Sequence, residues 1–321
     1  MSFTTTKIVD QFGNYYIDEG QNIKRVLQMV RQKTVTTTHA RPVFTDNTVY
    51  RFATTKFGSV VQQFQKKFTA KGEVEFRPNE IPLRQMKVDE SFYPDDIEGS
   101  WLGFLAGKEI AERKDWPIVR YMTEEYILGQ VPHDMEMKVY GKGKFVEPTD
   151  GQPGSPEQSL DGMITLCDAG ILNTEQPMNK VLLTGTISVT NAVDQLEAFV
   201  DNVDRLVRDN FKIKLFADPK LVDDYKKNYR KLFSGDPRYT DEKAGTIDFN
   251  TNIELVALPS LSETGALVAT PEDNFVHIRR TKKNNPPVIE SAKREVNIML
   301  DWWESLGFGY NEMVWYYKPT V

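Results

Sequence analysis

The chain has 321 residues, of which 40% are hydrophobic and 27% charged, as is ordinary for a folded chain of one or two domains. Its net charge of −6 argues against a protein that grips nucleic acid through a broad basic surface. No apolar run approaches the roughly 18 residues of a membrane span, and the first residues lack the pattern of a signal peptide. We therefore expect no membrane contact and no export signal.

The first 45 residues have little periodicity and are rich in threonine, whose branched side chain prefers extended backbone. Residues 22–32 predict one short basic helix, which carries Arg25 and Arg31. This segment has too little apolar surface to fold alone, so we expect it to be either disordered or laid across another surface.

Residues 46–90 predict long strands. Alternating patterns cover residues 49–53 and 73–77, a further strand is predicted over 60–68, and Gly72 supplies the turn between the last two. The hairpin carries charged side chains near its tip and on the returning strand: Lys66, Lys67, Lys71, Glu73, Glu75 and Arg77. Because a two-stranded hairpin is marginal in water, it must pack either on its own domain or on a partner.

Two helices are predicted next, over residues 94–108 and from Pro117 to Gly129. Pro94 opens the first, Asp115 is the N-cap expected for the second, and Gly129 is the expected C-terminal stop. Glu124 and Glu125 lie in the middle of the second helix. A solvated or interface-facing polar stripe is favoured there over a catalytic carboxylate pair.

The middle of the chain alternates between helices and strands, which predicts a small α/β layer. Before this layer, residues 135–140 predict a short strand and residues 141–156 a loop between sub-domains. The helices expected in the layer are 192–209, capped by Asn191, and 220–233. The expected strands are 181–189, 211–216, 253–258, 265–270 and 275–280.

The C-terminal residues predict a heavy aromatic hairpin. Residues 295–304 place apolar side chains on one face at period two, residues 305–310 form a glycine-rich turn, and residues 313–317 resume a strand. We expect this hairpin to be buried against a large element such as the helix at 117–128.

No catalytic motif stands out, and we expect no cofactor and no metal. The three histidines, His39, His133 and His277, have no metal-binding spacing, and the glycines at 141 and 143 lack the spacing of a phosphate loop. The single cysteine, Cys167, excludes an intrachain disulfide and is expected to be buried. A basic run at residues 279–283 is either a solvated loop or a contact for phosphate or an acidic partner. The residues favour a structural or interaction protein over an enzyme.

The order of these elements resembles that of the major capsid proteins of tailed bacteriophages, which have an α+β fold of the Hong Kong 97 type. An arm, an extended charged hairpin, a long helix, an α/β body and returning strands follow one another over essentially the whole chain. The most suggestive residues are 253–277 and the strand 296–303. The resemblance implies an N-terminal arm (1–45), an extended loop (46–93), a peripheral domain with a spine helix (94–159), an axial domain (160–252) and returning strands of both domains (253–321).

The resemblance implies a structural homo-oligomer that self-assembles from pentamers and hexamers into an icosahedral shell. Such a shell encloses double-stranded DNA without sequence-specific binding and forms the virion, after assembly in the cytoplasm of a bacterial host. Separate scaffolding, portal and decoration proteins are its expected partners. Ten charged residues are candidates for contacts between subunits: Lys66, Lys67, Lys71, Glu73, Glu75, Arg77, Arg25, Arg31, Glu124 and Glu125.

Some members of this family join subunits by an isopeptide bond between a lysine on the extended loop and an asparagine. Lys66, Lys67 and Lys71 lie in the corresponding region, but no asparagine or activating acid can be matched. We therefore expect these lysines to form salt bridges.

Two alternatives stay open at this point. One is an encapsulin-like nanocompartment, which shares the fold and encloses cargo enzymes. The other is an α/β enzyme whose site is assembled from dispersed residues such as Asp168, Glu175 and His133.

Overall fold

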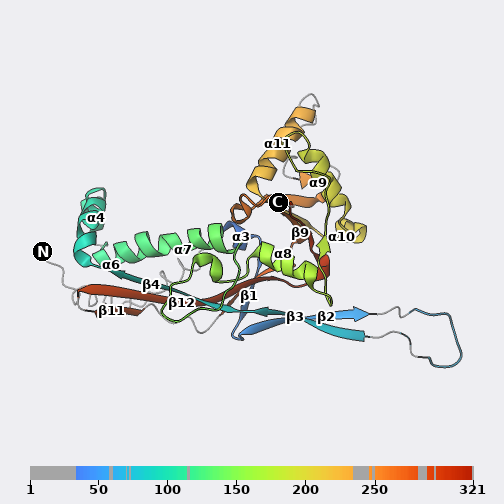
Figure 1. Ribbon diagram of the computed structural model, residues 1–321, viewed down its shortest axis with the longest axis horizontal. Helices are drawn as coiled ribbons and strands as arrows, with labels where there is room; N and C mark the ends of the chain where they lie inside the picture. Colours follow the sequence, from blue (N-terminus) through green and yellow to red (C-terminus); the bar gives the residue numbers. More distant parts are fainter. Residues whose placement is uncertain are drawn as a thin grey trace.

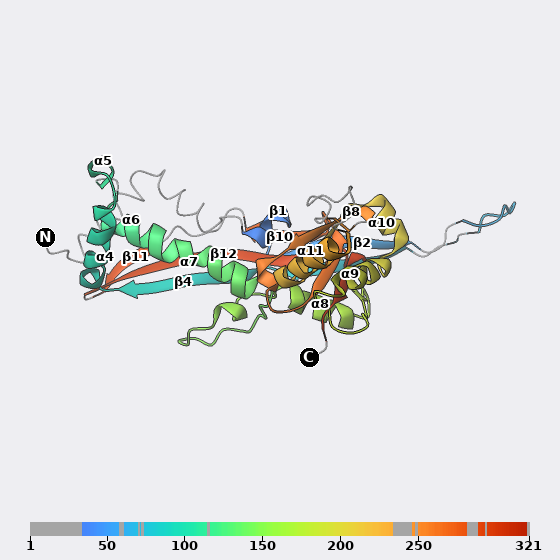
Figure 2. The ribbon, with the colours of Figure 1, turned by 90° about the horizontal axis from the view of Figure 1, so that it is seen from above.

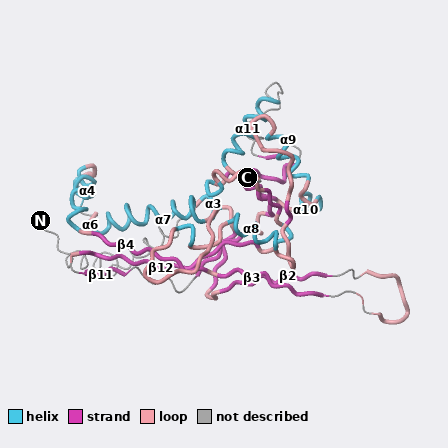
Figure 3. Tube along the Cα trace, viewed as in Figure 1, coloured by secondary structure: helices cyan, strands magenta, loops and turns pink. Residues whose placement is uncertain are grey.

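The computed structural model describes residues 34–57, 61–69, 71, 74–113, 116–233, 246–247, 250–280, 288–292 and 294–319. Figure 1 shows a long platform of strands lined by one long helix, with a compact lobe of helices and strands standing on it and a hairpin projecting from one end. Figure 3 shows that strands run through both the platform and the lobe, whereas helices cover only one side of the platform.

The platform is a five-stranded sheet built on one strand of 14 residues, β12 (Glu295–Phe308). Strand β12 pairs antiparallel with β4 (Arg84–Phe92), β10 (Phe275–Arg280) and β11 (Val288–Ala292), and β1 (Arg41–Thr45) is added in parallel to β10. The predicted period of two is confirmed, because Val296, Ile298, Leu300 and Trp302 are all buried.

The glycine-rich turn predicted at 305–310 is wrong, since β12 continues through Gly307 to Phe308. The side chain of Ile81 lies against the backbone of Gly307, where a Cβ atom would overlap the Ile81 Cδ1 atom. The glycine therefore permits close packing inside a strand rather than a turn.

The hairpin consists of β2 (Val49–Phe57) and β3 (Val74–Pro82), paired antiparallel from Val49 opposite Pro82 to Phe57 opposite Val74. The predicted strands at 49–53 and 73–77 are confirmed within the described residues. The strand predicted at 60–68 is wrong for residues 61–68, which have no regular structure. Strand β3 leads through Leu83 directly into β4, so the hairpin and the platform share one continuous backbone run.

One helix of 22 residues runs from Ile118 to Val139, and we call it the spine helix. It comprises α6 (Ile118–Arg120), α7 (Leu128–Asp134) and two π-helical segments, η2 (Tyr121–Ile127) and η3 (Met135–Val139). Val131, Met135 and Val139 recur at helical spacing and are buried in one cluster with Met86 and Trp302 of the platform.

The spine helix corrects two predictions. Its expected stop at Gly129 and the strand expected at 135–140 are both wrong, because the helix continues to Val139. Pro132 lies inside this helix without ending it. It lies in α7, between the π-helical segments η2 and η3, whose hydrogen-bond pattern differs from that of an α-helix.

The first predicted helix is confirmed as α4 (Pro94–Ala106), which is followed by the short α5 (Ile110–Arg113). Both lie at the end of the platform opposite the hairpin, α4 in Figure 1 and both helices in Figure 2. Trp101 Nε1 donates a hydrogen bond of 2.9 Å to the Trp116 carbonyl, and the Phe104 ring packs edge-on against the Trp116 ring. These contacts hold α4 against the start of the spine helix; Asp115, the expected N-cap, lies outside the described residues.

The lobe is built on a six-stranded sheet of order β5-β13-β9-β6-β8-β7. Its strands are β5 (Asn179–Lys180), β6 (Ile213–Ala217), β7 (Thr246–Ile247), β8 (Asn250–Ala257), β9 (Leu267–Pro271) and β13 (Trp315–Tyr317). Alternate residues of β6 enter different cores. Leu215 packs with α9 (Ala192–Asp201) and α11 (Pro219–Phe233), whereas Phe216 packs with α8 (Met163–Leu172) and the end of the spine helix.

Most predictions for the lobe are confirmed, including the strands at 211–216, 253–258 and 265–270 and the helix at 220–233. The strand predicted at 275–280 is confirmed as β10, but it belongs to the platform. The helix expected over 192–209 is divided, because Asp204 caps a second short helix, α10 (Arg205–Asn210), by accepting from the Leu206 N–H. The strand expected at 181–189 is wrong; only Asn179–Lys180 forms a strand. The loop expected over 141–156 is confirmed. Three short 3-10 helices complete the described elements: Pro156–Gln158, Pro259–Leu261 and Asn311–Met313.

The aromatic hairpin predicted at the C-terminus is also wrong. Strand β13 pairs with β9 and β5 of the lobe instead of with β12. Its residues Trp315, Tyr316 and Tyr317 are buried in the lobe, so their apolar character reflects burial in a different sheet. In the part of the chain that the structure describes, no helix is long and apolar enough to cross a membrane.

Candidate assembly surfaces

The tip of the hairpin, residues 61–69 and 71, exposes large apolar side chains. Val61, Phe64 and Phe68 are 81%, 91% and 92% exposed. Side-chain hydrogen bonds organise this segment internally: Gln62 Nε2 donates to the Thr69 carbonyl at 2.8 Å and Lys71 Nζ to the Val61 carbonyl at 2.5 Å. The tip therefore presents aromatic rings to solvent on a segment that has its own internal bonds.

The same tip is strongly basic. Its described residues include three lysines, Lys66, Lys67 and Lys71, and no acidic residue. Lys66 and Lys67 are exposed and have no salt bridge to any residue that the structure describes. Exposed apolar rings beside unpaired cations are typical of a surface that binds a partner of opposite charge.

A second feature is a groove of about 1050 Å³ beside the platform. Its floor is β4 from Gln85 to Glu90, one wall is the spine helix from Ile127 to Asp134, and the other is the loop of residues 145–159. The lining is acidic, with five carboxylates against the single lysine Lys87; the carboxylates belong to Asp89, Glu90, Asp134, Glu147 and Asp150.

The loop that walls the groove is fixed in place. The Arg84 guanidinium lies 3.5 Å from the centre of the Phe145 ring, and the Phe145 N–H donates to Asp161 at 3.0 Å. Backbone bonds from Lys144 to Glu157 and from Val146 to Gln158 close the loop on itself. The groove is thus formed before any partner binds.

The two central glutamates of the spine helix differ in environment. Glu124 is only 3% exposed, and its carboxylate binds the Arg120 guanidinium at 3.2 Å one turn earlier. The Arg120 guanidinium also lies 3.9 Å from the centre of the Trp116 ring. The polar stripe expected here, solvated or facing an interface, is wrong for Glu124, which forms a buried ion pair within the chain, whereas Glu125 is exposed.

The chain is tied to the spine helix at its first described residues. In α3 (Val35–Thr38), the Thr36 N–H and hydroxyl donate to the Glu136 carboxylate at 3.1 and 2.8 Å. The Thr36 hydroxyl also lies 2.7 Å from the Ser260 hydroxyl, in the loop after β8. All three residues are buried, so this contact joins the N-terminal segment, the spine helix and the lobe.

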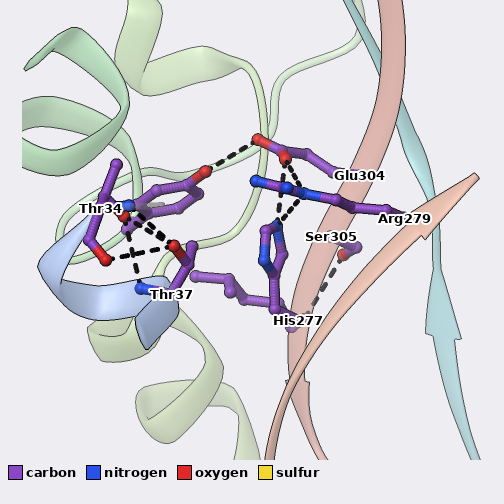
Figure 4. A network of polar contacts seen from close by, with 8 residues as sticks. Thr34, Thr37, His277, Arg279, Glu304 and Ser305 are labelled. Carbon is purple, nitrogen blue, oxygen red and sulfur yellow. Dashed lines mark hydrogen bonds and ion pairs between the residues drawn. The ribbon is translucent and has the colours of Figure 1, made fainter. Parts of the chain in front are cut away.

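A buried polar network lies close by, where the spine helix meets the platform (Figure 4). Glu304 of β12 accepts a hydrogen bond from the Tyr140 hydroxyl at 3.0 Å and lies 3.0 Å from His277 Nε2. The Arg279 Nε atom lies 3.4 Å from the same carboxylate. Burial opposes ionisation of Glu304, but the His277 contact, with help from Arg279, keeps its pKa below the ordinary value.

The ten residues predicted to contact other subunits are spread along the chain. Lys66, Lys67 and Lys71 are brought together at the tip, and Glu124 and Glu125 lie on the spine helix. The backbones of Glu75 and Arg77 pair with Lys56 and Thr54 in the hairpin. Arg25, Arg31 and Glu73 lie outside the described residues. The groove carboxylates were missed, because β4 and the loop 145–159 are far apart in sequence and share no motif.

The residues named for a dispersed enzyme site have separate surroundings. Asp168 of α8 binds Lys318 at 3.0 Å, while His133 is exposed on α7 and Glu175 is exposed in the lobe.

Cys167 is buried, as expected, and burial raises the pKa of its thiol. Among the described residues, no cluster of His, Cys, Asp or Glu has the geometry to hold a metal ion. Arg280 of the basic run lies over the Trp303 ring; Lys282 and Lys283 lie outside the described residues.

No family model and no curated protein matches the sequence. Solved structures do match the fold. A chain of the satellite phage P4 procapsid, which includes the size determination (Sid) protein, is similar with a TM-score of 0.59 and 12% identity, over 92% of this chain and 90% of that one. A chain of the capsid of an empty GTA particle is similar with a TM-score of 0.56 and 11% identity, over 90% of this chain and 91% of that one. A chain of Gordonia phage Cozz is similar with a TM-score of 0.52 and 13% identity, over 90% of this chain and 87% of that one.

These similarities extend over nearly the full length of each chain, so they describe the whole architecture rather than one sub-domain. The expected fold class, α+β of the Hong Kong 97 type, is confirmed. At 11–13% identity they establish the shared fold and do not assign roles to individual residues.

Proposed function

We propose that this chain is a major capsid protein, which self-assembles from pentamers and hexamers into a closed icosahedral shell around double-stranded DNA. The observation that carries the proposal is the projecting hairpin on a capsid-type fold. Its tip exposes Phe64 and Phe68 almost completely. Apolar rings of this size gain free energy only when a partner covers them.

The remaining architecture supports the same role. The platform, built on β12 and the spine helix, joins the lobe to the base of the hairpin, where Ile81 packs with Val276 and Ile278. Identical copies of a rigid subunit repeat each contact by symmetry, and many modest contacts then stabilise a closed shell. The net charge of −6 suits a container that encloses DNA without gripping it tightly.

The proposed parts of the subunit follow the segments expected from the sequence. We assign residues 1–45 to an arm, 46–93 to the extended loop, 94–159 to the peripheral domain, 160–252 to the axial domain and 253–321 to the returning strands. The anchor of Thr36 on Glu136 supports a fixed origin for the arm at residue 34. In this role the chain acts structurally, in the virion, beside separate scaffolding, portal and decoration proteins.

The test is expression of the full chain in bacteria, followed by light scattering and analysis of what any particles contain. The proposal predicts particles far larger than a subunit that protect DNA from nuclease. Empty particles filled on co-expression with a phage packaging machinery would also support it. Particles that instead retain a specific protein cargo and no nucleic acid would identify a nanocompartment, and a stable monomer under all conditions would contradict a shell.

A further inference from the structure

A small cavity lies where the hairpin base, the platform and the lobe meet. It has a volume of about 170 Å³ and is lined by residues of β3, β12 and α8. Three buried side chains, Ile81, Leu306 and Phe308, give it an apolar lining. Because an engineered apolar cavity of about 150 Å³ is known to bind benzene, this space fits one aromatic ring or a short carbon chain.

The cavity can be reached from solvent. Pro82 at the end of β3, Ala169 on α8 and Asn173 just after α8 all line it, and all three are exposed. Exposed residues on one side and buried ones on the other describe a pocket with a mouth and a floor. A ligand can therefore enter while the chain stays folded.

The charged lining of the cavity is entirely acidic. Its two charged residues are Glu80 and Asp161, and no lysine, arginine or histidine lines it. The Glu80 carboxylate pairs with Arg51 at 2.6 Å. One oxygen of the half-buried Asp161 accepts from the Phe145 N–H at 3.0 Å, but Asp161 has no salt bridge to any residue that the structure describes. Its carboxylate is thus available to a cation.

A buried hydroxyl provides a second acceptor. Ser305 lines the cavity and is only 6% exposed. Among the described residues its hydroxyl makes one long hydrogen bond, of 3.4 Å, to the Leu306 carbonyl. A hydroxyl oxygen also has lone pairs that accept hydrogen bonds, and an ammonium group carries three donors. The polar groups of this lining therefore favour a ligand that donates.

We propose that this cavity binds a small primary ammonium ion whose apolar part is one ring or a short carbon chain. The apolar part packs against Ile81, Leu306 and Phe308, and the ammonium group binds Asp161. The bound ion contacts β3, β12 and α8 together, so it holds the hairpin base against the lobe. One chain supplies the whole site, so the binding is independent of whether the chain forms a shell.

Benzylamine is a suitable probe, because it joins one ring to one ammonium group. Titration calorimetry on the unassembled full chain at neutral pH should give one site per chain, with a dissociation constant of about 1 mM or lower. Benzyl alcohol, the neutral analogue, should bind at least about tenfold more weakly, because it forms no charge-assisted bond to the carboxylate.

Two substitutions test the two parts of the site. Asp161→Asn keeps an oxygen for the Phe145 N–H and removes the charge, so benzylamine should bind about as weakly as benzyl alcohol. Ala169→Phe places a ring at the mouth and should weaken the binding of both ligands. Ala198→Phe, at an exposed position on α9, is the matched control and should change neither. Circular dichroism checks that each variant is folded.

Hydrogen exchange tests the effect on the hairpin. With benzylamine at about ten times its dissociation constant, amide exchange around Ile81 should slow by at least about threefold, because opening there requires release of the ligand. Exchange in α11, which does not line the cavity, should stay unchanged. Unchanged exchange around Ile81 would overturn the proposal that the ion holds the hairpin base.

Three further results would overturn the binding itself. Equal binding of benzylamine and benzyl alcohol to the unmodified chain, or binding of neither, would mean that the cavity holds only water. Benzylamine binding that survives both Asp161→Asn and Ala169→Phe would place the ligand elsewhere. Loss of the binding in assembled particles would mean that a side chain of a neighbouring copy, and not a free amine, fills the cavity.

Discussion

The His277 Nε2 atom lies 3.0 Å from the Glu304 carboxylate, and both side chains are almost completely buried, at 4% and 3% exposed. The pair joins neighbouring strands, β10 and β12, at the point where Tyr140 ends the spine helix. The Arg279 Nε atom also lies 3.2 Å from His277 Nε2. Because one nitrogen cannot donate to Glu304 and accept from Arg279 at once, the tautomer of His277 selects its partner.

Removing the charge of Glu304 should destabilise the subunit. Glu304→Gln leaves Arg279 and His277 without their buried anion, and we expect a loss of about 3 kcal/mol in the free energy of unfolding. Chemical denaturation of the unassembled subunit measures it. Glu125→Gln, on an exposed carboxylate, is the control and should change stability by less than about 0.5 kcal/mol. Equal effects of the two substitutions would contradict a structural role for the network.

The same carboxylate gives stability a defined pH dependence. The folded-state pKa of Glu304 is below its ordinary value of 4.5, because the contacts with His277 and Arg279 outweigh burial. Its stabilising contribution is therefore complete above that ordinary value and is lost as pH falls through the lower folded pKa. Between roughly pH 5 and 3, unfolding of Glu304→Gln should depend less steeply on pH than unfolding of the unmodified chain. Parallel curves would contradict the assignment.

The anchor of α3 should depend on one hydroxyl. Thr36→Val keeps the shape of the side chain but removes the hydroxyl that contacts Glu136 and Ser260. It leaves buried partners unsatisfied, so we expect a loss of about 1–3 kcal/mol in thermal or chemical unfolding. Thr38→Val, on an exposed side chain of the same helix, should cost clearly less. A larger loss from Thr38→Val would show that the helix, not the buried contact, carries the stability.

Gly307 tests the packing of the hairpin base on the platform. A methyl group there would overlap the Ile81 side chain, so Gly307→Ala should destabilise the subunit by about 1–3 kcal/mol. Ile81→Val removes the Cδ1 atom that would be overlapped, and the double variant should recover part of the loss. Gly103→Ala on α4, where nothing lies within 4 Å, should instead stabilise by up to about 1 kcal/mol. Additive losses at Gly307 and Ile81 would argue against this contact.

The lysines of the tip should matter for assembly and not for folding. Replacing Lys66, Lys67 and Lys71 together with Glu reverses the charge of an exposed segment, so the subunit should fold normally but assemble poorly or into altered particles. Sedimentation velocity measures the size of the unassembled subunit and of the assembled particles. The matched variant at Lys142, Lys144 and Lys180, three exposed lysines elsewhere, should assemble normally. Normal particles from the tip variant would mean that the hairpin does not clamp a neighbour.

Local patterns in the sequence predict the elements that are buried on one side. The period of two in β12 and the helical spacing of α11 follow from the face that each element buries. The incorrect predictions arise where contacts between distant residues outweigh a local signal. Gly129 was expected to end the helix, but packing of Val131, Met135 and Val139 on the platform keeps the spine helix intact. Tertiary contacts there outweigh local propensity.

The two candidate surfaces, the tip and the groove, also differ in whether the sequence predicts them. The lysines of the tip are close in sequence, so their grouping can be predicted from the sequence. The groove needs β4, the spine helix and the loop 145–159 to meet, and no local pattern encodes that meeting. The pairing of β13 with β9 is another long-range contact, because the apolar pattern of a strand does not specify which strand it pairs with.

Closure of this subunit into a shell can be seen by negative-stain microscopy of the purified full chain, with and without a crowding agent. We expect closed particles, or rings of five and six subunits, to form from the unmodified chain and to be lost in the Lys66→Glu/Lys67→Glu variant. Monomers or dimers alone, under crowding and in the presence of co-expressed scaffolding protein, would contradict it.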